Sequence, residues 1–70
     1  MFTLMTKIEN VSYERESNIR GHLSLISAAV PEIKVDILTR DELPGIVGVS
    51  ISGENFERVR SADRQFQLLI

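Results

Sequence analysis

Few residues of this chain have the types and spacing that catalysis or metal binding requires. His22 is the only histidine, and the absence of cysteine excludes disulfides and thiolate metal sites. A catalytic histidine needs an orienting acid and a nucleophile within reach, but Ser24 faces elsewhere on a helix that carries His22. We therefore expect a protein that is not an enzyme, with no catalytic residue, metal site or cofactor.

The segment "GIVG", residues 45–48, has the Gly-x-x-Gly spacing of the loop with which KH domains hold nucleic-acid phosphates. That loop joins two helices and carries basic residues, whereas here Ile46 and Val47 stand between the glycines and alternating aliphatic residues follow. The stretch also lacks an aromatic residue on which a base could stack. The pattern favours a strand, in which Gly48 marks a bulge or the close approach of another backbone.

Charged residues are the remaining chemical candidates. Arg58, Arg60 and Arg64 could contact phosphate or an acidic partner, but neighbouring acids offset them, which favours a salt-bridged solvent face. The adjacent acids Asp41 and Glu42 lie in a predicted turn and do not converge on one point, as cation binding requires. With a formal charge of −2 and no basic tract, the chain argues against a nucleic-acid partner.

Hydrophobic periodicity predicts the elements that carry these residues. Strand-like alternation and helical spacing divide the chain into strands at 2–11, 32–39 and about 46–53, and helices at 12–30 and 54–69. Ser12 or Ser17 would cap the first helix and Pro31 would end it, while Gly21 in its middle suggests that another backbone passes close by. The order predicts a single α+β domain over residues 1–70: β-α-β-β-α, with a three-stranded mixed sheet, two helices packed on one face, and the last two strands paired as an antiparallel hairpin.

If the alternation holds, Met5, Leu38 and Ile46 project from the sheet face that no helix covers. The chain also ends Leu68-Leu69-Ile70, which is more aliphatic residues than one helical stripe needs. Two interpretations stay open: a surface that meets another protein or a second copy, or scattered surface hydrophobic residues, which are ordinary. A domain of this size without disulfides is marginally stable, so covering such a face would stabilise it.

The N-terminal residues lack the basic start and continuous apolar run of a signal peptide, and no segment approaches the ~20 apolar residues of a membrane span. We therefore expect a soluble, cytoplasmic protein with no membrane partner. Small stand-alone proteins of this kind are often regulators of a larger machine, for instance of phage or mobile-element origin.

The segments "VPEIKVDIL" (30–38) and "GIVGVSISGENFERV" (45–59) resemble the DinI-like family of DNA-damage-induced proteins that bind the RecA recombinase. Val30-Pro31-Glu32 stands where that family has a Phe-Pro-Asp junction between helix and strand. The resemblance implies the same fold and modulation of a RecA-type recombinase. It does not extend to the family's acidic, Trp-bearing C-terminal end, which is implicated in RecA contact and has no counterpart in "RQFQLLI".

The sequence therefore predicts a non-enzymatic interaction or regulatory module. It would act through the open sheet face or the C-terminal helix, as a homo-oligomer that binds another protein. The alternatives are a DinI-like modulator of a recombinase and a nucleic-acid-binding protein that uses the arginine-bearing helix.

Overall fold

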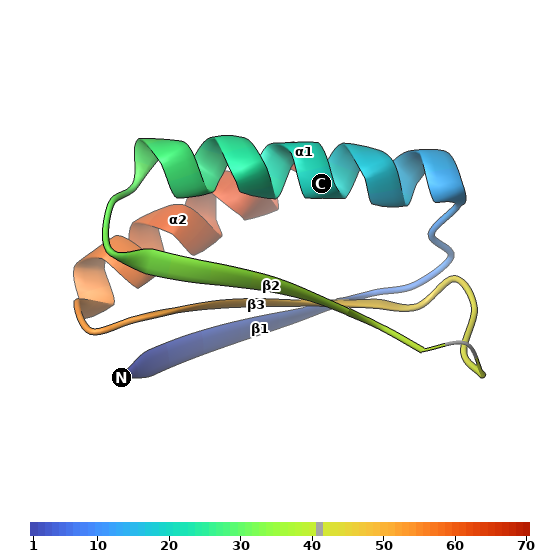
Figure 1. Ribbon diagram of the computed structural model, residues 1–70, viewed down its shortest axis with the longest axis horizontal. Helices are drawn as coiled ribbons and strands as arrows, with labels where there is room; N and C mark the ends of the chain where they lie inside the picture. The colour runs from blue at the N-terminus through green and yellow to red at the C-terminus, as the bar shows by residue number, and fades with distance from the viewer. Residues whose placement is uncertain (41) are drawn as a thin grey trace.

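The computed structural model describes residues 1–40 and 42–70, so Asp41 of the predicted acidic turn lies outside the described residues. Three strands and two helices follow one another in the predicted order (Figure 1): β1 (Phe2–Ile8), α1 (Tyr13–Ala29), β2 (Ile33–Thr39), β3 (Val47–Gly53) and α2 (Phe56–Leu69). The β-α-β-β-α arrangement expected from the sequence is thereby confirmed.

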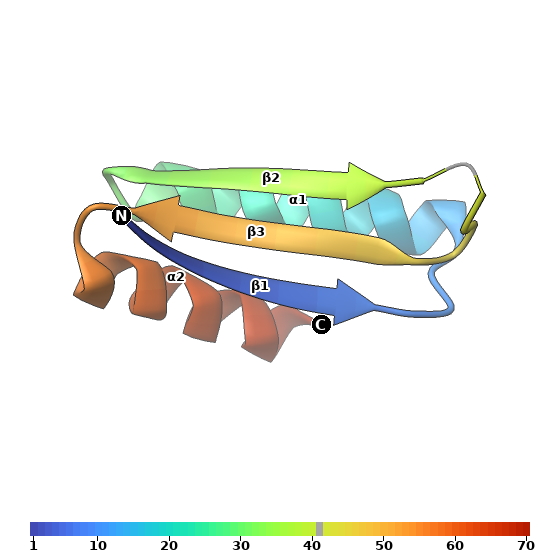
Figure 2. The same cartoon turned by 90° about the horizontal axis from the view of Figure 1, so that it is seen from below.

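The sheet has the strand order β1-β3-β2, so that the last strand in the chain is the central one. β1 and β2 point the same way with β3 between them (Figure 2), and β3 pairs antiparallel with both. The hairpin of β2 and β3 is confirmed, but the mixed sheet is wrong. Because β3 separates the two parallel strands, no parallel pair forms and the sheet is antiparallel throughout.

Both helices lie on the same face of the sheet (Figures 1 and 2). The predicted alternation holds in all three strands. The inward residues of β3 are buried, and those of the two outer strands are buried or half-buried, except for the exposed end residues Phe2 and Thr39. One hydrophobic core joins residues from the helices, the sheet and the connection after α1: Ile8, Ile19, Leu23, Ile26, Val30, Val47, Val49, Ile51, Val59, Ala62 and Phe66.

The helix boundaries follow from capping. Of the two serines considered, Ser12 caps α1, and its Oγ accepts a hydrogen bond from the backbone N–H of Arg15 at 3.2 Å. Val30, before Pro31, is extended and ends the helix. α2 begins two residues later than expected, because the Oδ1 of Asn55 accepts hydrogen bonds from the N–H groups of the next turn.

Two glycines have opposite surroundings. A Cβ on Gly53, at the end of β3, would lie 2.9 Å from the carbonyl oxygen of Glu32 and 3.1 Å from the Cγ2 of Val59. Only glycine allows these backbones to approach so closely. Around Gly21, by contrast, nothing beyond its chain neighbours and the backbone of its own helix lies within 4 Å of the Cβ position, so the close approach of another backbone expected in the middle of α1 is wrong.

Candidate interaction surface

The uncovered face of the sheet has a furrow along its central strand. In the observed register, Gly48 and Ser50 of β3 are each flanked by larger side chains from both neighbouring strands. The rows across the sheet are Lys7, Gly48 and Leu38, then Met5, Ser50 and Asp36. On this face, small residues thus lie along the central strand and longer ones at its sides, and we call the strip along Gly48 and Ser50 the furrow.

At one end of the furrow the described residues form a hollow of about 350 Å³. Its aliphatic side chains come from three different parts of the chain: Met5 from β1, Leu38 from β2, and Leu43 and Ile46 from the connection between β2 and β3. Met5 and Leu38 are 67% and 55% exposed, although large aliphatic side chains usually find cover in a folded domain. The structure thus brings together the predicted interface residues Met5, Leu38 and Ile46.

Gly48 provides the floor of this hollow. The register with β1 and with β2 runs through Gly48 without interruption, so the bulge considered from the sequence is absent from these strands. A Cβ on Gly48 would lie 3.6 Å from the Cβ of Leu38, an ordinary contact distance. Glycine here keeps the floor low enough for the neighbouring side chains to stand above it.

Two basic residues complete the lining. Lys7 and Arg40 are the charged residues among those described around the hollow, and no described acid lines it. Lys7 lies 3.4 Å from the carboxylate of Glu9, but both side chains are well exposed. This ion pair is therefore weak, and Lys7 can readily pair with an acid of a partner instead. The hollow therefore combines aliphatic walls above Gly48 with a basic rim.

Leu43 follows Asp41 and Glu42 in the predicted turn, and the sequence analysis did not predict that it would line a surface hollow. The one available signal was a leucine in an otherwise polar turn. Its 45% exposed side chain lines the hollow because the chain returns across the end of the sheet after β2. Ile46, expected as an outward strand residue, instead precedes β3 and is half-buried.

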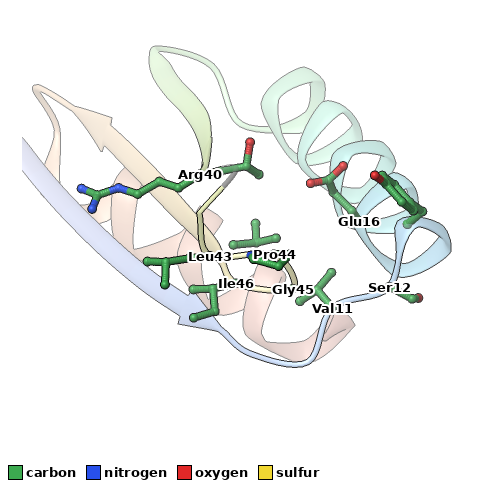
Figure 3. Close-up of a pocket in the computed structure, with 11 residues that line it drawn as sticks. Val11, Ser12, Glu16, Arg40, Leu43, Pro44, Gly45 and Ile46 are labelled. Carbon is green, nitrogen blue, oxygen red and sulfur yellow. The ribbon is translucent and has the colours of Figure 1, made fainter.

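A second hollow, of about 420 Å³, lies on the other side of the same connection, against the start of α1 (Figure 3). The backbone N–H of Val11 donates to the carbonyl of Gly45 at 2.9 Å and ties the two connections together. The side chain of Glu16 faces this space, and its carboxylate lies 3.9 Å from Arg20. Ser12 Oγ is occupied as a helix cap. Among the described residues, the lining thus offers one acid and no nucleophile with a base beside it, which is not a catalytic constellation.

His22 is half-buried on α1, and the described residues give it no hydrogen-bond partner. Nor do the described residues contain a cluster of three or more histidine and acidic side chains that could hold a metal ion.

The three candidate arginines do not converge on one site. Arg58 lies 3.9 Å from the carboxylate of Glu32, which precedes β2. Arg60 and Arg64 are exposed and four residues apart on α2, so they share a helix face, while Arg58 lies on another. The other predicted interface residues, Leu68, Leu69 and Ile70, are exposed at the end of α2, in the helix layer rather than on the open sheet face (Figure 1).

No model of a known protein family, no curated protein and no solved structure matches this chain. In the described part of the chain, neither helix has the length and apolar character that crossing a bilayer demands.

Proposed function

We propose that this protein is a non-enzymatic interaction module that docks another protein on its open sheet face. The observation that carries the proposal is the hollow formed by Met5, Leu38, Leu43 and Ile46 over Gly48. An aliphatic hollow beside polar residues is what protein-binding surfaces present, since a buried apolar anchor supplies much of the affinity. The domain would work in the cytoplasm and as a homo-oligomer.

The charges around the hollow indicate the chemistry of the partner. Lys7 and Arg40 lie beside the aliphatic side chains, and the described lining has no acid. The complementary ligand is a segment with one or two large apolar side chains flanked by aspartate or glutamate. Opposite charges at the rim of such a contact chiefly raise the association rate and the specificity, and salt weakens them.

The test compares partner capture by the wild type, by Met5→Lys, Leu38→Lys, and by a control double variant, Leu25→Lys, Ala28→Lys. The control adds the same two charges to exposed positions on α1, in the helix layer. We expect the sheet-face variant to lose captured proteins that the wild type and the control both retain. If the sheet-face variant keeps the wild-type partners and the wild-type native mass, docking on this face is refuted.

DinI-like modulation of a recombinase is a second candidate, supported by the β-α-β-β-α order. Because "RQFQLLI" differs from the acidic end of that family, the activity needs a direct test. The purified protein would be added to a RecA co-protease assay. A change in the cleavage rate supports this candidate, and an unchanged rate at micromolar excess removes it.

A further inference from the structure

Because β3 is central, β1 and β2 are both edge strands, and α2 shields only the first of them. α2 runs along the outer side of β1 (Figure 2). The Nε2 of Gln67 donates to the Oγ1 of Thr6 at 2.9 Å, and the rings of Phe2 and Phe56 pack with their centroids 5.2 Å apart. A strand that paired with the outer edge of β1 would therefore run beside α2, and a helix in this position helps to cover that edge.

The outer edge of β2 has no such cover. α1 lies behind β2 and β3 (Figure 2), and the described residues give β2 no hydrogen-bond partner other than β3. Its core-facing side chains, Ile33, Val35 and Ile37, are only half-buried, whereas Val49 and Ile51 of the central strand are each 1% exposed. The outer edge of β2 therefore has unpaired main-chain N–H and C=O groups beside aliphatic surface that remains exposed to solvent.

We propose that β2 pairs antiparallel with β2 of a second copy, with Val35 opposite the second copy's Val35. In this register Lys34 of each copy faces the second copy's Asp36 on the open side of the sheet. Ile33 of each copy faces the second copy's Ile37 on the core side. Opposite charges and aliphatic residues directly across two strands are the stabilising cross-strand pairs. The product is one continuous sheet in the order β1-β3-β2-β2-β3-β1.

Three of the neighbouring registers that keep core-facing residues on the core side are electrostatically unfavourable. Pairing centred on Asp36 puts two aspartates opposite each other, and pairing centred on Lys34 puts two lysines opposite each other. Pairing centred on Ile37 brings Lys34 against the second copy's Arg40. An edge strand protected against its own copy would carry like charges, whereas β2 alternates a base and an acid on one face.

This inference rests on the self-association in the proposed function and assigns it to the edge of β2 rather than to the open face. The proposed pairing uses the outer backbone edge of β2, whereas the hollow opens on the uncovered face of the sheet and shares with that strand the side chain of Leu38. The two proposals can therefore fail independently.

The test measures native mass by sedimentation equilibrium of the full chain over a range of concentrations. We expect the wild type to reach twice its 7.9 kDa mass. Lys34→Glu and Asp36→Lys each turn both charge pairs repulsive, so each variant alone should dimerise roughly tenfold or more weakly. Mixing the two variants restores opposite charges at both pairs, and the mixture should form a heterodimer.

The matched control is Arg15→Glu, which changes the charge as Lys34→Glu does. Arg15 is at an exposed position of α1, away from β2, so this variant should dimerise like the wild type. Circular dichroism checks that every variant folds. A wild type that stays monomeric at all concentrations, a dimer that is indifferent to both reversals, or a mixture that stays monomeric would each overturn the proposal. Dimerisation lost in Met5→Lys, Leu38→Lys but kept in Lys34→Glu would move the self-contact to the open face.

Discussion

Replacing Gly53 by alanine should destabilise the fold, although the same substitution at Gly21 should stabilise it. The added Cβ at position 53 would lie 2.9 Å from the carbonyl oxygen of Glu32 and 3.1 Å from the Cγ2 of Val59. Favourable carbon contacts lie at roughly 3.5–4.0 Å, so both neighbours would have to move. Neither moves easily, because the oxygen belongs to the backbone at a residue with φ of 65°, and Val59 is completely buried.

Overpacking of this kind costs about 1–3 kcal/mol, and two simultaneous close contacts place Gly53→Ala near 2 kcal/mol. At position 21 nothing beyond the chain neighbours and the helix's own backbone lies within 4 Å of the new Cβ. Alanine there gains helix propensity and restricts the unfolded chain, which stabilises by about 0.5–1 kcal/mol. The two variants therefore differ in the sign of their effect on the free energy of unfolding, although the chemical change is identical.

The assay is urea unfolding followed by circular dichroism at one fixed protein concentration, since self-association makes stability depend on concentration. With a denaturant slope of about 1 kcal/mol per M for so small a domain, Gly53→Ala should lower the midpoint by about 2 M. Gly21→Ala should raise it by about 0.5–1 M. A Gly53→Ala protein as stable as the wild type, or a weakened Gly21→Ala protein, would refute the reasoning from close contacts.

Two further substitutions test the core and the second helix. Phe66→Ala removes the largest fully buried side chain and should lower the free energy of unfolding by about 3–5 kcal/mol, which approaches the whole stability of a small domain. The variant should therefore lose its helical circular dichroism signal at 25 °C, and a native spectrum would contradict this prediction. Asn55→Ala removes the cap that accepts the N–H groups of Glu57 and Arg58, and should lower the free energy of unfolding by about 1 kcal/mol. Ser61→Ala, at an exposed position of α2, is its control and should change stability by less than about 0.5 kcal/mol; equal effects of the two would show that the cap contributes nothing.

Periodicity was sufficient to predict the elements and the faces of the strands. In "IKVDIL" and "VGVSIS", every second residue is aliphatic, and these residues face the helices. Alternation predicts this because the aliphatic side of a strand packs against the second layer of the domain. The start of α2 was harder to predict, because Asn55 determines it through a side-chain hydrogen bond that hydrophobic spacing does not encode.

Strand order could not be predicted, because alternation reports faces and not neighbours. β3 is central, and its inward residues are more deeply buried than those of β2. Its outward residues are small, which gives the open face its furrow. Only the pairing of β3 with both neighbours brings Met5 and Leu38 to the same hollow, and only the path of the turn adds Leu43. The exposure of Met5 and Leu38 was thus predictable from the alternation, but not the hollow that they line together with Leu43.

The most direct test of the open face as a docking surface is site-specific photo-crosslinking in the cells that express the protein. A photoreactive amino acid would replace Met5 in one variant and Leu25 in the other, positions whose side chains are 67% and 69% exposed. Equal exposure makes random collisions equally frequent, while β1 lies away from the proposed edge contact of β2. We predict covalent adducts with another protein at position 5 and not at position 25. Adducts equally abundant at both positions, or none at position 5, would contradict a docking role for this face.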